Sequence, residues 1–289
     1  MSSPHSRCPI DQSRDNRPDL DTYYESPSGH FWIHYDLSGD NAPNLVDNNN
    51  NSIPDYVESA AEAADSARFV LIDRMLYINE ENDDDGKYDI YILDLSDNLW
   101  GNCQDEGSSS FIRIRSSYQG MSDFCSNETE LLWLTVGHEF FHAIQYAYRS
   151  NSSDSYFREL TSMWFENIFV PNCYDFLDFV DSGSEALFND PEKAFDHPNS
   201  GMVGYSLALY GHYLSNIIGQ NQSDNQMSTT IIREIWEDYS QGGTIFQSVR
   251  DVLENDIYNT TFQKTWIDFM SSNMFCGEYD NMSNNIINI

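Results

Sequence analysis

The chain has 289 residues and a formal net charge of −33 at pH 7, so it lacks the basic surface that general nucleic-acid binding requires. Of its residues 40% are hydrophobic and 14% aromatic, enough for a sizeable core, yet no apolar run is long enough to span a membrane. We therefore exclude a nucleic-acid partner and a membrane span, and we expect a monomeric globular protein.

The first segment, residues 1–22, is polar and contains Pro4, Pro9 and Pro18, so we expect a disordered lead-in. It has no apolar stretch of the kind that forms a signal peptide. Nevertheless we expect an extracellular or cell-surface protein, because other features of the sequence favour the outside of the cell.

Three stretches predict β-strands. Residues 29–36 alternate apolar and polar side chains, and residues 88–94 form a mostly apolar run. A Gly- and Ser-rich loop at 101–110 then leads to the third strand at 111–115. The arginines of this third strand predict that it lies at the edge of the sheet.

An Asp- and Asn-rich segment between the first two strands resembles a calcium-binding loop. When Asp47 is counted as position 1, oxygen-bearing side chains fall at positions 1, 3, 5, 9 and 12, as in an EF-hand loop. Ser52 stands where such a loop usually has glycine. The alternative is a flexible polar linker. The expected calcium ligands are the side chains of Asp47, Asn49, Asn51, Asp55 and Glu58 and the carbonyl group of Ile53.

Helical periodicity predicts a helix at 55–75 and a mainly helical chain beyond residue 128. We expect an α+β fold with a zincin-like arrangement, in which the active-site helix lies at a cleft. An N-terminal α/β lobe with a mixed sheet at 23–128 precedes a helical lobe at 129–289, and the two form one catalytic unit. The later helices are expected at 129–149, 155–170, 174–181, 203–218, 228–240, 244–254 and 259–274.

The predicted helix at 129–149 contains the motif His-Glu-x-x-His, formed by His138, Glu139 and His142. A chance match in a chain of this composition is expected only about once in a hundred cases for a motif of this kind. Residues four apart share one helix face, so both imidazoles can bind one zinc ion. Glu139 is then placed to act on a water molecule at the metal.

A catalytic zinc ion needs a third protein ligand. Glu159 and Glu166 lie seven residues apart on the next predicted helix, so both can face the histidines when a short loop folds this helix back. One carboxylate can bind the zinc ion while the other orients an imidazole. The spacing alone leaves open which residue has which role.

These residues resemble the gluzincin pattern of thermolysin-like and aminopeptidase-like zinc enzymes. More closely, the chain resembles a family of bacterial and archaeal proteins classed as secreted metallopeptidases. That family has a His-Glu-Tyr-Phe-His-Ala-Ile-Gln motif, a later Trp-x-x-Glu-Gly-x-Ala-x-Trp-x-Glu motif and an earlier Asn-Gly-Ile-Pro-Asp-Tyr-Val-Glu loop. The matching positions here are 138–145, Glu159 with Trp164 and Glu166, and 53–58, within a likeness that covers roughly residues 22–275.

The resemblance implies that Glu159 is the third zinc ligand and that Glu166 is a supporting residue. The chain departs from the family pattern at Phe140 in the first motif. In the second motif it departs at three positions, Tyr156, Leu160 and Ser162. These differences affect the packing of the second helix rather than the ligand.

The expected reaction is hydrolysis of a peptide bond in a peptide or protein substrate, with Glu139 as the general base. A second donor to the oxyanion is expected from Tyr205 or His197. The strand at 111–115 is expected to hold an extended substrate through main-chain hydrogen bonds, and its arginines to meet acidic substrate side chains.

Two other functions are compatible with these residues. One is a non-catalytic, calcium-stabilised binding or adhesion module with a vestigial zinc site, which the complete set of His138, Glu139, His142 and Glu159 disfavours. The other is zinc-dependent hydrolysis of a different amide or ester.

The five cysteines are widely spaced, and none forms a Cys-x-x-Cys pair, which disfavours a zinc ribbon. An oxidising compartment would allow disulfides between Cys103 and Cys125 and between Cys173 and Cys276, with Cys8 left over. The alternative is that all five remain reduced thiols.

Overall fold

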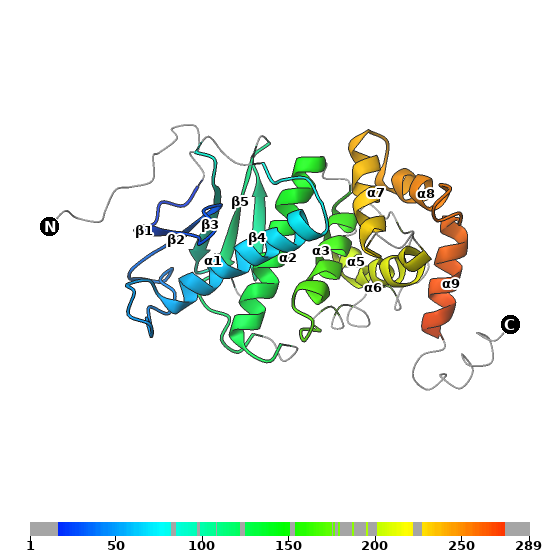
Figure 1. The fold of residues 1–289 in the computed structure, drawn as a ribbon. Coiled ribbons are helices and arrows are strands. Elements are labelled where there is room, and N and C mark those ends of the chain that lie inside the picture. Colours follow the sequence, from blue (N-terminus) through cyan, green and yellow to red (C-terminus); the bar gives the residue numbers. More distant parts are fainter. Residues whose placement is uncertain are drawn as a thin grey trace. The chain divides into compact units, whose positions relative to one another are not determined.

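A computed structural model gives the three-dimensional structure of the protein (Figure 1). The residues that the structure describes are 17–81, 85–96, 99–107, 109–121, 125–150, 154–174, 176, 179, 187, 195, 201–221 and 227–274. They confirm the α+β class, with a mixed sheet in the N-terminal part and helices in the C-terminal part.

The chain divides into two compact units, Met1–Ser206 and Leu207–Ile289. The boundary at 128/129 that we expected from the sequence falls inside the first unit. The first unit contains the sheet together with the helix that bears the His-Glu-x-x-His motif, because this helix packs directly against the strands.

The first unit is built on a five-stranded sheet with the strand order β1-β2-β3-β5-β4. The inner pairs β2/β3 and β3/β5 are parallel, and the outer pairs β1/β2 and β4/β5 are antiparallel. The strands are β1 (Thr22–Glu25), β2 (Phe31–Tyr35), β3 (Tyr88–Leu93), β4 (Gly101–Asp105) and β5 (Ser110–Arg115).

Two expectations for the sheet were wrong. The segment 101–110, expected as a loop, contains β4, and the edge strand beside β5 is β4 rather than β5 itself. Strand β4 has no alternation of apolar and polar residues, so its pairing with β5 is not encoded in its own pattern. The arginines of β5 are not a sign of an edge position, because their guanidinium groups bond to neighbouring loop and strand atoms.

Helices α1 (Asp55–Arg68) and α2 (Glu128–Tyr148) pack against each other and against the sheet (Figure 1). Helix α1 presents a stripe of small buried alanines, which permits close packing, and continues into a π-helical turn at Phe69–Arg74. Helix α2 is buried along most of its length, and its Phe140 contacts Phe31 and Tyr88 of the sheet. A helix covered on several sides needs apolar residues all round, as its sequence shows.

Helix α3 (Ser155–Phe169) follows α2 and runs antiparallel to it, as predicted, because residues late in α2 contact residues early in α3. Gly137 of α2 makes the close approach possible, since a Cβ atom there would lie 2.6 Å from the Phe169 ring. The short helix α5 (Gly201–Ser206) packs on α3 and completes the described part of the first unit.

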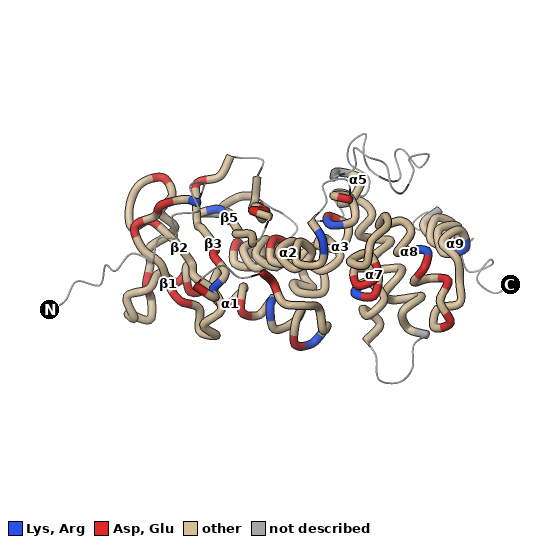
Figure 2. Tube along the Cα trace, turned by 90° about the horizontal axis from the view of Figure 1, so that it is seen from above, with Lys and Arg blue, Asp and Glu red and all other residues tan. Residues whose placement is uncertain are grey.

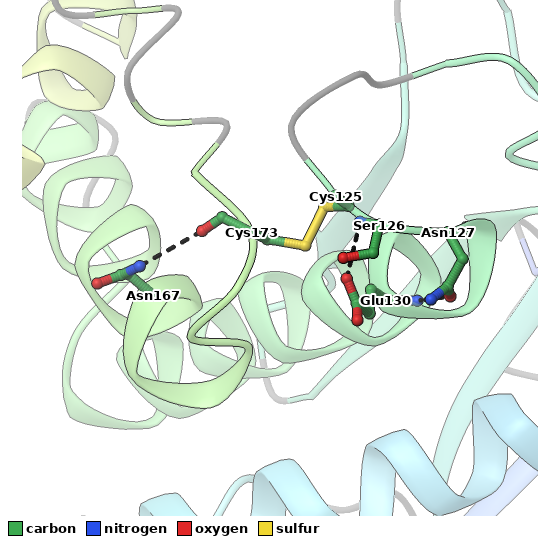
Figure 3. Close-up of a disulfide and its surroundings, with 6 residues drawn as sticks. All are labelled: Cys125, Ser126, Asn127, Glu130, Asn167 and Cys173. Carbon is green, nitrogen blue, oxygen red and sulfur yellow. Dashed lines mark hydrogen bonds between the residues drawn. A yellow bond between two sulfur atoms is a disulfide. The ribbon is translucent and has the colours of Figure 1, made fainter.

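A disulfide joins Cys125, just before α2, to Cys173, just after α3 (Figure 3). This pairing replaces the predicted pairs of Cys103 with Cys125 and of Cys173 with Cys276. The antiparallel α2–α3 hairpin brings its two ends together, whereas Cys103 is a free thiol on β4 that contacts the Tyr88 hydroxyl. Cys8 and Cys276 lie outside the described residues.

The second unit is helical in the part that the structure describes. Its core contains Trp236, Tyr239 and Leu253. Helix α8 begins with a capping box in which Thr244 and Gln247 satisfy each other's main-chain amides. Its helical elements are α6 (Ala208–Tyr213), the π-helical turn η3 (Leu214–Ile218), the 3-10 turn η4 (Gly219–Asn221), α7 (Thr230–Ser240), α8 (Ile245–Leu253) and α9 (Phe262–Met274).

Candidate metal centre

Helix α2 presents His138 and His142 on one face, four residues apart. Both residues are 7% exposed, and their ring centroids lie 4.7 Å apart with the rings nearly perpendicular. Their Nε2 atoms point toward the same carboxylate on α3. Two imidazoles held in this way can bind one metal ion between them.

Glu159 of α3 supplies that carboxylate. Its Oε2 atom lies 3.2 Å from Nε2 of His138 and 3.4 Å from Nε2 of His142. One ligand atom from each of the three residues lies within 4.8 Å of the others, a grouping that can hold a metal ion. The helical spacing did not decide between Glu159 and Glu166 as the third ligand. In the structure Glu159 is the one that lies between the two imidazoles.

Glu166 lies on the other side of His138. Its Oε1 atom is 2.6 Å from Nδ1 of His138, and its side chain is buried. A carboxylate at Nδ1 fixes the imidazole ring and leaves Nε2 directed at Glu159. The supporting role that the resemblance implies for Glu166 stays a prediction, and this contact is compatible with it.

His142 has a corresponding partner that the sequence analysis missed. Oε1 of Gln145 lies 2.8 Å from Nδ1 of His142, and Gln145 is fully buried. A signal was present in the sequence, because Gln145 is a polar residue inside an apolar helix and lies three residues, almost one turn, after His142.

Charges at the centre alter the ionisation of its residues. Burial alone would lower the pKa of His138, but the nearby carboxylates, Glu166 foremost, hold it well above its ordinary value. Burial alone would raise the pKa of Glu159, but His142 and His138 hold it well below the ordinary range. The metal-free centre is therefore a tightly coupled group of imidazoles and carboxylates.

Glu139 leaves the ligand face of α2 and faces the edge strand β4. A Cβ atom on Gly101 would lie 3.0 Å from its Cγ atom, and the main chain of Cys103 lies close enough to act on the pKa of its carboxyl group. Its Oε2 atom is buried and has no hydrogen-bond partner among the described residues. Burial raises the pKa of Glu139. A buried carboxylate with one free oxygen suits a proton acceptor for a water molecule.

Tyr205 of α5 reaches the centre from the side of Glu159. A Cβ atom on the preceding residue, Gly204, would lie 2.8 Å from Cβ of Glu159, so only glycine allows this approach. The Tyr205 ring stacks 6.3 Å from the His138 ring and 4.9 Å from Phe179. Burial and the Glu159 carboxylate raise the pKa of Tyr205, so its hydroxyl keeps its proton.

The other expected oxyanion donor, His197, lies outside the described residues. Of the two candidates, only Tyr205 therefore has a described position beside the ligands.

The strand next to the centre is β4, which corrects the expectation that the strand at 111–115 holds the substrate. Glu106 donates its N–H to the carbonyl of Ser109 at 2.9 Å, and hydrogen-bonded pairs alternate along an antiparallel ladder. The main-chain groups of Gly101, Cys103 and Asp105 therefore point away from β5, toward the outer edge.

The guanidinium groups of the arginines of β5 bond to other parts of the protein. Nε of Arg113 donates to Asn102 Oδ1 at 2.8 Å. Nη1 of Arg115 donates to the carbonyl of Ser96 at 2.7 Å. Arg115 thus holds the loop that leads into β4, a structural role that the sequence pattern did not reveal.

The Asp- and Asn-rich loop is folded around its own side chains, apart from the metal centre. The amide groups of Asn49 and Asn51 donate to the two oxygens of Glu58 at 2.9 and 2.6 Å. Asp47 accepts from the main-chain N–H groups of residues 51 and 52 at 3.2 and 2.8 Å. Ser52 has a φ of 75°, the left-handed conformation that glycine adopts at this position of a calcium loop.

Asp55, another of the expected ligands, accepts from the main-chain N–H of Asn48 at 3.1 Å. The expected carbonyl ligand, Ile53, donates its own N–H to Asn51 Oδ1 at 2.9 Å. These contacts hold the loop in a closed turn.

No protein-family model matches the chain, and no curated protein shows significant similarity to it. Among the helices that the structure describes, none combines the length and the apolarity needed to cross a membrane. The function is therefore inferred from the residues and the geometry of the metal centre.

Proposed function

We propose that the protein is a zinc-dependent metallopeptidase of the gluzincin type. The observation that carries this proposal is the convergence of His138, His142 and Glu159, whose ligand atoms lie within 4.8 Å of one another beside Glu139. Such a set of two imidazoles and one carboxylate, with a glutamate next to the first histidine, is typical of zinc peptidases.

The residues fit a zinc ion better than a harder cation, because imidazole nitrogen is a preferred ligand of zinc and a poor ligand of calcium or magnesium. Three protein ligands leave one position of a tetrahedral site open. A zinc ion bound there would supply Lewis acidity, which polarises the substrate carbonyl group and acidifies water.

Glu139 would carry the proton in this reaction. Its free Oε2 atom can accept a proton from the attacking water, and the same carboxyl group can return it to the departing amine. Burial raises the pKa of Glu139, which makes it a better proton acceptor than an exposed glutamate.

Tyr205 would donate a hydrogen bond to the oxyanion, since its hydroxyl keeps its proton and its ring lies beside His138 and Glu159. An extended substrate would lie along the outer edge of β4, where the main-chain groups of Gly101, Cys103 and Asp105 point away from β5.

We also propose that the loop at 47–58 binds calcium, supported by its closed conformation and by the left-handed Ser52. Extracellular function is part of the same proposal, supported by the disulfide between Cys125 and Cys173, since disulfides persist mainly in oxidising compartments.

The decisive experiment compares the wild-type protein with Glu139→Gln. We expect purified wild type to contain about one zinc ion per chain and to cleave casein or a peptide library, with activity lost on chelation and restored by zinc. Glu139→Gln should keep its zinc and lose at least about a hundredfold in kcat. Glu62→Gln is a matched control, because Glu62 is an exposed glutamate on α1 and not one of the residues of the metal centre.

Two outcomes would overturn the proposal. Cleavage that survives Glu139→Gln undiminished would show that this glutamate is not the base. Bound zinc without cleavage of any peptide would favour the alternatives, hydrolysis of another amide or ester or a binding module with a vestigial site.

A further inference from the structure

Gln145 is a polar side chain enclosed in the core between α2 and α3, and it is 0% exposed. Its Oε1 atom lies 2.8 Å from Nδ1 of His142. Its Nε2 atom donates to the carbonyl of Arg158 at 3.2 Å, to Oγ1 of Thr161 at 3.0 Å and to Oγ of Ser162 at 3.1 Å. Every polar atom of this amide group therefore has a partner on α2 or α3.

The partners on α3 fix which end of the amide faces which helix. The carbonyl of Arg158 can only accept, so the NH₂ group must face α3. The hydroxyl of Thr161 uses its proton toward the carbonyl of Phe157 at 2.9 Å and so accepts from Gln145. The oxygen of the amide must then face His142.

The amide oxygen in turn fixes the tautomer of His142. A carbonyl oxygen can only accept, so Nδ1 of His142 must carry a hydrogen, and the nitrogen left to bind a metal ion is Nε2. Nε2 points toward Glu159, 3.4 Å away, on the side where the metal would lie. Ser162, with its Oγ atom 3.3 Å from Nδ1, is a longer contact that is compatible with the same tautomer.

We infer that Gln145 is a positioning residue of the metal centre, which sets the tautomer of His142 and its distance from Glu159. The bond to Arg158 ties it to the main chain immediately before Glu159, so a single side chain connects two ligands on two helices. Gln145 places a neutral amide oxygen at Nδ1 of His142, just as Glu166 places a carboxylate oxygen at Nδ1 of His138. The effect of Gln145 on metal affinity rests on the proposed function, whereas the position of the hydrogen on His142 does not.

The first test uses the metal-free wild-type protein, labelled with ¹⁵N at histidine, and reads the tautomer of His142 by long-range proton–nitrogen NMR. We expect hydrogen on Nδ1, whether or not the Glu159 carboxylate also holds a proton on Nε2. In Gln145→Met, which has no oxygen to accept, we expect the hydrogen on Nδ1 to be lost in part or in full. An Nδ1 without hydrogen in the wild type would overturn the inference, whether or not the protein binds zinc.

The second test measures zinc affinity by competition with a chromophoric chelator. We expect Gln145→Met to bind zinc about 10–100-fold more weakly than the wild type. Thr265→Val is the control for loss of a buried hydrogen bond, because Oγ1 of Thr265 lies 2.8 Å from the Tyr210 hydroxyl within the second unit. This variant should lose thermal stability but keep its zinc affinity.

Unchanged zinc affinity in a folded Gln145→Met protein would contradict the positioning role. If Gln145→Met does not fold, the tautomer of the wild type decides. Failure of the wild type itself to bind zinc would contradict the proposed function, but it would leave the tautomer test intact.

Discussion

Tyr205 shows how one residue reaches a metal centre from a separate helix. Because Gly204 has no side chain, α5 can approach Glu159 closely enough to bring the Tyr205 ring beside His138. The ring also stacks on Phe179, with the ring centroids 4.9 Å apart. Removal of the hydroxyl alone should therefore leave the ring in place and isolate its chemical contribution.

We expect Tyr205→Phe to lower kcat by about 10²–10³-fold, the usual cost of losing one donor to an oxyanion. KM and zinc affinity should change little, because the hydroxyl acts on charge that develops in the transition state. Steady-state kinetics on one peptide substrate, with zinc content measured in parallel, checks this expectation.

His197 provides the comparison for this test. If Tyr205→Phe keeps full kcat while His197→Gln loses it, then the donor is His197 and our assignment is wrong. A loss in both variants would indicate that two groups act on the same oxygen.

The residues of the centre differ in how well the sequence reveals them. His138 and His142 follow from helical spacing, which also indicated Glu159 and Glu166 as candidates without deciding between them, because α2 and α3 are regular helices joined by a short loop. Gln145 was missed because its role depends on the carbonyl of Arg158, which no side-chain pattern displays. Tyr205 remained one of two candidates, since the approach of α5 depends on a close contact at Gly204.

At the scale of elements, the α2–α3 hairpin carries all three metal-ligand candidates, and a disulfide joins its two ends. The helix start is also capped, because Asn127 accepts from the main-chain N–H of Glu130 at 3.0 Å (Figure 3). The side chain of Glu130 accepts a hydrogen bond from the main-chain N–H of Ser126 at 2.9 Å. At this end of the hairpin the disulfide therefore joins the two helices, and the hydrogen bonds cap the start of α2.

Breaking this disulfide should destabilise the protein. Cys125 and Cys173 are 48 residues apart in sequence, and a loop of that length corresponds to about 4 kcal/mol of lost chain entropy in the unfolded state. We expect the double variant Cys125→Ser, Cys173→Ser to lose up to about that amount in denaturant unfolding.

Reduced wild type is the matched control and should behave as the double variant does. Peptide mapping under non-reducing conditions should find Cys103 as a free thiol, since the described structure leaves it outside any disulfide. A disulfide that includes Cys103 would contradict the pairing.

The elements also show which parts of the fold the sequence could predict. Helices α1, α2 and α3 and strands β2, β3 and β5 were expected, because each has a clear periodic or apolar pattern. Strand β4 was missed because Gly101–Asp105 has no such pattern and is ordered by its neighbours β5 and α2. For the same reason the edge of the sheet was assigned to β5 instead of β4.

At the scale of the whole molecule, the dominant property is the net charge of −33. Acidic residues are distributed over both units, and basic residues are far fewer along the described chain (Figure 2). Repulsion among these charges opposes the compact state, and salt screens it. We expect the melting temperature to rise as NaCl increases from 0.01 to 0.15 M, since the Debye length then falls from about 30 Å to about 8 Å.

Calcium should stabilise the protein beyond this screening effect if the loop at 47–58 binds it. The measurement compares calcium, magnesium and sodium chlorides at equal ionic strength, without a chelator, so that the zinc centre is undisturbed. We expect a further rise in melting temperature with calcium, which grows with its concentration as expected for a ligand of the folded state. Magnesium should raise the melting temperature less than calcium does, because a flexible loop with many oxygen ligands suits the larger calcium ion.

Two variants on α1 separate binding in the loop from general screening. Glu58→Gln and Glu62→Gln each remove one negative charge, but only Glu58 accepts from Asn49 and Asn51 in the loop. Glu58→Gln should abolish the calcium-specific increment and keep the response to sodium, whereas Glu62→Gln should keep both. If the calcium increment survives Glu58→Gln, calcium acts as a diffuse counterion, and the loop is not its site.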